Sequence, residues 1–240
     1  MPARRDSRRG WAAATDLARR GGVAPAEIAA RGSAAPPELA AALAALARGG
    51  VVVYPTETFY GLGARALRAA AVAKVASLKG RDATKPVAVI VSEAAMLDQL
   101  VARIPKPAER LMARFWPGPL TLVLPARADL PVELTARSGL VGVRVSSHPV
   151  ARALAAALGE PITATSANRG GETPACDVAT AERAFGARVD AYVDGGALAG
   201  GSGSTVVVVG DDVVRVIRAG AVSLEALRHV LGTTPLESPG

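Results

Sequence analysis

The sequence predicts an α/β protein built on a twisted, mixed β-sheet flanked by helices. Apolar runs with the length and residue types of strands alternate with alanine- and leucine-rich segments of helical type. Near the C-terminus, two valine-rich runs flank Gly210, Asp211 and Asp212, a turn sequence that favours an antiparallel hairpin. This hairpin makes the sheet mixed rather than purely parallel. The chain has 240 residues and is 50% hydrophobic, so it can bury a full core.

The first half of the chain alternates predicted helices and strands. Pro36 and Pro37 open a helix that ends at Gly49 and Gly50. The run Val87–Val91 has no polar position, which is typical of a strand buried on both faces. The other elements expected here are a strand at Val51–Tyr54, a helix at Ala69–Leu78, helices near Glu93–Val101 and Pro107–Phe115, and a strand at Leu120–Leu124.

The second half continues the alternation. A strand at Val141–Val145 leads into a helix that starts near His148, and Ser223 is a residue type that caps the start of a helix. The other elements expected here are a strand at Ile162–Thr165, a helix at Asp177–Phe185, and the hairpin strands Ser204–Val209 and Val213–Ile217.

Charge divides the chain into two parts. Residues 1–33 carry seven arginines and three acidic residues, a net charge of +4 out of +7 for the whole chain. We interpret residues 1–33 as a basic, flexible extension and residues 34–235 as one folded, catalytic domain. Such a tail is more often a solvated extension than a dedicated nucleic-acid arm.

Composition excludes several classes of protein. The single cysteine, Cys176, and the two histidines, His148 and His229, leave no internal disulfide and no Cys/His zinc cluster, so we expect no protein metal site. No apolar run approaches the roughly 20 residues that span a bilayer, and no signal-type apolar core follows the basic N-terminus. We therefore expect a soluble, cytoplasmic protein without a membrane partner, whose catalysis uses no histidine-centred triad.

Polar and glycine-rich segments cluster where the predicted elements end. After Val51–Tyr54, we expect a turn, kept open by glycine, that presents Thr56, Glu57, Thr58 and Tyr60. Ligands of open α/β sheets collect beyond the strand ends, so these segments are expected to converge on one pocket. Their cations, hydroxyls and glycines make up a nucleotide phosphate site. The segments are Thr56–Gly63, Lys79–Pro86, Trp116–Thr121, Arg144, Thr165–Gly171, Gly201–Thr205 and Arg218.

Each segment taken alone also has a plain structural interpretation. The cations of Lys79–Lys85 can complement a helix dipole, and Thr56 and Thr58 can cap a turn. Trp116 is expected to pack in the core rather than to stack on a ligand.

Taken in chain order, seven segments resemble the L-threonylcarbamoyladenylate synthase (YrdC-like) family. They are YPTETFYGLG, KGR followed by KP, FWPGPLTLVLP, VGVRVSSHPVA, TSAN, STVV and IRAG, and the resemblance covers about residues 38–227. It implies a twisted α/β fold around a large basic cleft, and the conversion of L-threonine, bicarbonate and ATP, with Mg²⁺, to threonylcarbamoyl-AMP and pyrophosphate. It also implies a separate transferase complex that uses the product to make threonylcarbamoyl-adenosine (t6A) in tRNA.

The resemblance implies a role for individual residues. Thr56, Arg144 and Ser204 are implied to bind threonine, with Arg144 pairing with the carboxylate. The implied ATP-binding residues are Lys79, Arg81, Lys85, Ser166, Asn168 and Arg218. Of these, Lys79 and Arg81 grip the phosphates and are the implied catalytic residues. We expect both cations to lie exposed at a helix end, so that replacing them leaves the fold intact.

The chain departs from the family pattern in three places. Ile90 stands where many members have a histidine, so one expected contact to threonine is missing. Lys85 replaces a common asparagine, and residues 1–33 have no recognised counterpart. Nothing after the last helix corresponds to the additional domain of longer members, so the chain resembles the short, single-domain form.

Two other functions are alternatives to threonylcarbamoyladenylate synthesis. A non-catalytic RNA-binding module would use the same basic cleft, although aromatic residues for base stacking make up only 3% of the chain. An adenylating domain acting on carbamoyl phosphate, as in hydrogenase-maturation carbamoyltransferases, would carry cysteine-rich zinc fingers, which the single cysteine excludes.

Overall fold

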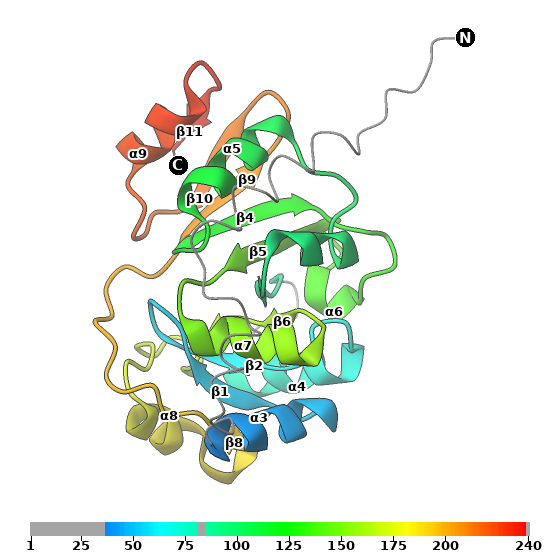
Figure 1. The fold of residues 1–240 in the computed structure, drawn as a ribbon, viewed down its shortest axis with the longest axis vertical. Helices are drawn as coiled ribbons and strands as arrows, with labels where there is room; N and C mark the ends of the chain where they lie inside the picture. The colour runs from blue at the N-terminus through cyan, green and yellow to red at the C-terminus, as the bar shows by residue number, and fades with distance from the viewer. Residues whose placement is uncertain (1–36, 81–84, 239–240) are drawn as a thin grey trace, which may run out of the picture.

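The computed structural model describes residues 37–80 and 85–238, which form two β-sheets with helices packed against them (Figure 1). The α/β class and the mixed sheet are therefore confirmed. The single sheet that we expected is divided in two. The predicted extension, residues 1–33, and its boundary at residue 34 lie outside the described residues, so the domain division stays a prediction.

The larger sheet has seven strands and contains most of the predicted ones. Its members are β3 (Val89–Val91), β4 (Leu120–Pro125), β5 (Leu140–Val145), β6 (Ile162–Thr163), β9 (Thr205–Val209), β10 (Val214–Arg218) and β11 (Leu236–Glu237), in the order β11-β10-β9-β4-β5-β3-β6. Strands β9 and β10 pair antiparallel as the hairpin signal predicts, whereas β3 and β5 pair parallel.

The smaller sheet has four strands. It contains β1 (Val52–Pro55), β2 (Tyr60–Gly63), β7 (Thr165–Ser166) and β8 (Ala191–Tyr192), in the order β7-β2-β1-β8. Strands β1 and β2 form an antiparallel hairpin in which Tyr54 lies opposite Gly61.

The described helices cover both sheets. They are α3 (Pro37–Ala47), α4 (Ala69–Lys79), α5 (Lys106–Phe115), α6 (Val132–Thr135), α7 (Pro149–Leu158), α8 (Val178–Phe185) and α9 (Leu224–Leu231), with the 3-10 helices Ala94–Gln99 and Gly186–Arg188. Figure 1 shows α5 and α9 beside the seven-stranded sheet at one end of the molecule, and α3 and α8 beside the four-stranded sheet at the other. Each of these helices falls short of the length and apolar character that crossing a membrane requires.

Most predicted helices are found within a few residues of their expected bounds. The helix expected near Glu93–Val101 is a 3-10 helix instead, and sequence patterns did not reveal α6, β8 or β11. Ser223 caps α9 as predicted, because its hydroxyl accepts a hydrogen bond from the N–H of Ala226 at 3.1 Å.

The chain passes from one sheet to the other within the segment predicted as a single strand, Ile162–Thr165. Strand β6 ends at Thr163 and β7 starts at Thr165, with Ala164 between the sheets. The buried Thr163 binds back to the smaller sheet: its hydroxyl accepts the N–H of Ala64 and donates to the carbonyl of Leu62, both at 2.9 Å. The break therefore satisfies its polar groups inside the protein.

The glycines after Thr56 do not keep a turn open, contrary to our expectation. Only Thr56–Phe59 form a loop, because Tyr60 begins β2, and Gly61 and Gly63 lie within that strand. The buried ring of Tyr54 explains the glycines: a Cβ atom at Gly63 would lie 2.7 Å from its Cε1 atom. Glycine is required here by close packing across the hairpin.

Tyr60 is also placed differently from our expectation. Its side chain is buried and points to the segment after β8, where its hydroxyl donates to the carbonyl of Gly196 at 2.8 Å and accepts the N–H of Gly195 at 2.9 Å. Tyr60 therefore holds a neighbouring loop and is not presented with Thr56.

We expect Gly63→Ala to lower the free energy of unfolding by about 1–3 kcal/mol, because the methyl group must displace the ring of Tyr54. Gly61→Ala should cost less, since a Cβ atom there lies 3.3 Å from the same ring. Urea unfolding measures both. In a Tyr54→Leu background the added cost of Gly63→Ala should shrink, and an unchanged cost would show that the ring is not the obstacle.

Candidate functional site

The predicted site residues gather in three clusters of side chains. Lys79 meets Ser166 and Asn168, and Ser204 meets Arg218. Arg144 meets Glu57, which was expected on the presented turn but without an assigned role, and Ser146, which was not predicted. Four of the six predicted residues in these clusters lie in or directly beside a strand, Asn168 lies two residues after β7, and Lys79 ends helix α4.

The first cluster joins the Lys-Gly-Arg and Thr-Ser-Ala-Asn segments. Lys79 ends α4, and Gly80 closes the helix in the left-handed conformation with φ of 59°. The Lys79 ammonium donates to the carbonyls of Ser166 and Asn168 at 2.7 and 3.0 Å, and to Asn168 Oδ1 at 2.9 Å. In return, the carbonyl of Lys79 accepts the N–H of Gly170 at 2.7 Å. Two segments 87 residues apart are thus tied together.

The burial of Lys79 corrects our expectation that it is an exposed cation. Its relative exposure is only 8%, and oxygen atoms of the Ser166–Asn168 segment surround its ammonium. A buried charge held by several hydrogen bonds contributes to stability, so its replacement will not leave the fold untouched. Arg81, the second implied catalytic residue, lies outside the described residues.

The second cluster lies where β9 begins and β10 ends. The Ser204 hydroxyl is 3.0 Å from that of Thr121. The Arg218 guanidinium donates to the Ser204 carbonyl at 2.8 and 3.1 Å and to its hydroxyl at 2.9 Å. Partial burial of the guanidinium lowers the pKa of Arg218 below its usual value, and the positive charge of Arg144 lowers it further. The strand pairing connects the second and third clusters, because Arg144 lies on β5, which pairs with β4, and Thr121 of β4 contacts Ser204.

The third cluster is centred on Arg144 of β5. Its guanidinium forms a salt bridge with Glu57 from the β1–β2 loop, and the hydroxyl of Ser146 donates to the same carboxylate. The side chains of Arg144 and Glu57 are only 6% and 14% exposed. A nearly buried ion pair whose carboxylate accepts from two donors is fixed in position.

His148 borders the third cluster. Its backbone N–H donates to the hydroxyl of Ser146 at 3.1 Å, and its Nδ1 accepts the N–H of Val150 at 3.3 Å, which caps α7. Burial lowers the pKa of the imidazole, and the carboxylate of Glu57 only partly opposes this shift. The side chain therefore favours the neutral form near pH 7.

Thr56 caps the loop between β1 and β2, as its plain structural interpretation predicts. Its hydroxyl donates to the carbonyl of Phe59 at 2.7 Å and accepts the N–H of Thr58 at 3.2 Å, and the residue is only 2% exposed. A contact between Thr56 and threonine stays a prediction.

Ile90, Lys85 and Trp116 lie outside the three clusters, each in a different environment. Ile90 is fully buried and lies opposite Arg144 in the parallel β3–β5 pair, so both side chains share one face of the sheet. Lys85 is exposed. Trp116 packs against the core and donates to the carbonyl of Leu120 at 2.7 Å, which confirms its predicted role.

Sequence reasoning missed Ser146, and it placed Glu57 and Thr121 in segments expected at the pocket without giving either residue a role. Ser146 had a signal, because residues two apart in an extended chain point to the same side and Ser146 follows Arg144 at that spacing. Glu57 is the only acid in the Thr56–Gly63 segment, and a basic pocket requires a counter-charge. Thr121 ends a segment expected at the pocket, but nothing in the sequence indicates its pairing with Ser204, which is 83 residues away.

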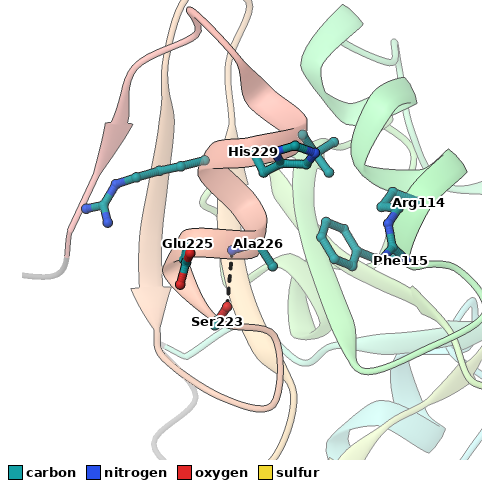
Figure 2. Close-up of a pocket in the computed structure, with 8 residues that line it drawn as sticks. Arg114, Phe115, Ser223, Glu225, Ala226 and His229 are labelled. Carbon is teal, nitrogen blue, oxygen red and sulfur yellow. Dashed lines mark hydrogen bonds between the residues drawn. The ribbon is translucent and has the colours of Figure 1, made fainter.

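Two surface hollows lie away from these clusters. One is formed between α5 and α9, where Arg114, Phe115 and His229 face each other (Figure 2). The other lies beside the end of α3 and is lined by Arg48, Arg65, Arg68, Lys74 and their neighbours. No predicted site residue lines either hollow, and the large basic cleft implied by the family resemblance stays a prediction.

In the part of the chain that the structure describes, no three His, Cys, Asp or Glu side chains group together as ligands for an ion.

Comparison with known proteins identifies the family. The model of the Sua5/YciO/YrdC family, described as "Telomere recombination", matches residues 44–220. Because this is well over half of the 240 residues, the chain belongs to the Sua5/YciO/YrdC family.

Three known proteins illustrate the similarity. The threonylcarbamoyl-AMP synthase of Bacillus subtilis is 38% identical over 192 residues, 80% of this chain and 56% of that protein. The threonylcarbamoyl-AMP synthase of Thiobacillus denitrificans is 45% identical over 152 residues, 63% of this chain and 80% of that protein. The crystal structure of P. abyssi Sua5 complexed with L-threonine is similar with a TM-score of 0.79 and 34% identity, over 83% of this chain and 58% of that chain. This chain thus spans little more than half the length of the first and third proteins.

We expect Lys79→Met to lower the free energy of unfolding by about 2–4 kcal/mol, because it leaves the oxygens of Ser166 and Asn168 without their buried donor. Lys85→Met is the matched control and should change stability by less than about 0.5 kcal/mol, since Lys85 is exposed. Urea unfolding of both variants provides the measurement. Equal stabilities would contradict the structural role of Lys79.

Proposed function

We propose that this chain is an L-threonylcarbamoyladenylate synthase, a nucleotidyltransferase that joins L-threonine, bicarbonate and ATP into threonylcarbamoyl-AMP and releases pyrophosphate. The observation that carries the proposal is the buried guanidinium of Arg144 on β5, which Glu57 holds. Strand β5 pairs with β4, whose Thr121 contacts Ser204. Membership of the family, the names of the similar synthases and the threonine bound to P. abyssi Sua5 support it.

The threonine subsite is centred on Arg144. Its guanidinium pairs with the carboxylate of the amino acid, because two parallel N–H groups match the two oxygens. Ser204 and Thr56 supply hydroxyls that orient the amino acid. Ile90, which shares the face of Arg144, presents an apolar side chain and offers no hydrogen bond to it.

The nucleotide subsite uses the first cluster and Arg218. Lys79 fixes the segment that carries Ser166 and Asn168. Together with Arg81 and Lys85, these three residues bind the phosphates of ATP. ATP enters as its Mg²⁺ complex, in which phosphate oxygens and water supply most of the ligands of the ion and the ion offsets negative charge on the phosphates.

The proposed chemistry joins two anions. The neutral amine of threonine forms a C–N bond to the carbon of bicarbonate, a C–O bond of bicarbonate breaks, and water leaves with a proton of the amine, which gives a carbamate. A carbamate oxygen then attacks the α-phosphorus of ATP, the bond from that phosphorus to the bridging oxygen breaks, and pyrophosphate leaves. Bringing the two anions together requires positioned cations, and this requirement agrees with a site rich in arginine and lysine.

The product has a place in tRNA modification. A separate transferase complex would transfer the threonylcarbamoyl group to adenosine in tRNA to make t6A, and we place the reaction in the cytoplasm. We include direct contact between this chain and RNA in this proposal.

The test is release of pyrophosphate by the pure protein. We expect release only when threonine, bicarbonate and Mg·ATP are all present, with threonylcarbamoyl-AMP identified by mass spectrometry. Release that does not depend on threonine would overturn the proposal. RNA binding without any turnover would favour the non-catalytic RNA-binding module.

We expect Arg144→Ala to raise the KM for threonine by roughly 10- to 100-fold, because it removes a charge-assisted pair with the carboxylate. The kcat/KM for serine should be about tenfold lower than for threonine, since serine lacks one methyl group that the site buries. Arg215→Ala is the control, because Arg215 is exposed and pairs with Glu237 at the surface. Saturation curves for wild type, Arg144→Ala and Ile90→His measure these effects. A normal threonine KM in Arg144→Ala would exclude this subsite.

A further inference from the structure

We propose that Glu57 is a positioning residue that holds one side of the Arg144 guanidinium, so that its other side faces the carboxylate of the amino-acid substrate. This inference rests on the proposed function and assigns a task to a residue that contributes no donor to the substrate. Glu57 comes from the loop between β1 and β2, whereas Arg144 comes from β5 of the other sheet.

Both oxygens of the Glu57 carboxylate are occupied. Oε1 accepts from Nη1 of Arg144, and Oε2 accepts from the hydroxyl of Ser146. The Ser146 hydroxyl itself accepts the backbone N–H of His148 at 3.1 Å. This chain of hydrogen bonds fixes the rotation of the carboxylate and therefore the plane of the guanidinium that binds to it.

The remaining nitrogens of Arg144 are available to a ligand. Arginine has five N–H donors, and in the described part of the chain Glu57 is the one partner of this guanidinium. Among the described residues, the only buried side-chain nitrogen or oxygen atom without a partner is Nε of Arg152. The nitrogens of Arg144 that do not bind Glu57 are therefore not fully buried, although the side chain as a whole is only 6% exposed. The planar fork of a guanidinium can bind a carboxylate by two parallel bonds.

Charge explains why a carboxylate is needed at this position. Arg144 and Arg218 are both cations, on β5 and β10 of the same sheet, and the charge of Arg144 lowers the pKa of Arg218. The carboxylate of Glu57, which pairs with Arg144, offsets part of this positive charge. Because Glu57 already occupies one side of the guanidinium, a second carboxylate is directed to the opposite side, which sets the direction of the substrate amine.

The experiment compares threonine and ATP saturation of the wild type with that of Glu57→Ala, Glu57→Gln and Ser146→Ala. We expect Glu57→Ala to raise the threonine KM at least tenfold, and Glu57→Gln and Ser146→Ala to raise it about three- to fivefold, because each keeps part of the contact. The ATP KM and the kcat at saturating threonine should stay within about threefold. A loss of kcat with an unchanged threonine KM would overturn the proposal and indicate a role in proton transfer.

Two controls separate positioning from general damage to the fold. Glu160→Gln breaks a comparable ion pair, with Arg65, outside the three clusters, and it should leave the threonine KM unchanged. In an Arg144→Ala background, Glu57→Ala should change the threonine KM by less than twofold, because its effect passes through Arg144. Multiplicative effects would overturn the proposal. If Glu57→Ala does not fold, Glu57→Gln, which keeps the shape of the side chain, carries the same test.

Direct binding of L-threonine, measured by calorimetry, separates this proposal from the proposed function. If the wild type binds threonine but makes no threonylcarbamoyl-AMP, the synthase function fails, and the Kd values of the Glu57 variants still test positioning. If the wild type is active and Glu57→Ala binds threonine with unchanged Kd, positioning fails while the function stands. A wild type that binds no threonine overturns both.

Discussion

The position of the site depends on one buried side chain, Tyr54. Its ring lies across Gly61 and Gly63 of the paired strand, and its hydroxyl donates to the carbonyl of Thr163 at 2.8 Å in the other sheet. Burial raises the pKa of this hydroxyl well above its usual range, so it stays protonated and remains a donor. A single residue therefore packs the β1–β2 hairpin tightly and sets its distance from the seven-stranded sheet. Thr56 and Glu57, which follow directly, are positioned by that packing.

The site combines a surplus of cations with a single well-placed anion. Arg144 and Lys79 carry charge in places that water reaches poorly, whereas Arg218 is exposed, and each of the three is held by protein oxygen atoms. Such an arrangement costs desolvation energy in the folded state and is stabilised by hydrogen bonds that orient the donors. Cations that are oriented in advance need no reorganisation when charge develops on a ligand, and under the proposed function this property would serve in place of an acid–base histidine.

Much of the fold could be predicted from the sequence, because long apolar runs and helix signals are local. The hairpin of β9 and β10 and the helices opened by Pro37 and Ser223 follow from a few adjacent residues. The division into two sheets could not be predicted, since Ile162–Thr165 resembles one strand and its break depends on contacts with Leu62 and Ala64 about a hundred residues away. The role of the glycines in β2 was missed for the same reason.

The candidate site shows the same limit. The types of residue in the motifs predicted Arg144, Ser204 and Lys79 as a group, and the structure brings each of them to a strand or helix end. The burial of Lys79 and the pairing of Glu57 with Arg144 depend on segments that are 87 to 89 residues apart. Patterns along one chain report which face a residue occupies, but they do not report what lies opposite that face.

The break at Ala164 also bears on how the protein unfolds. Two residues on one side of it complete the edge of the larger sheet, and two residues on the other side complete the edge of the smaller one. Neither sheet can lose this segment without removing an edge strand from its neighbour, so the sheets are expected to melt as one cooperative unit. Ser166 lies in β7 and Asn168 two residues after it, so we expect both residues to be protected from local unfolding. We therefore expect Ser166 and Asn168 to keep the same geometry whenever the protein is folded.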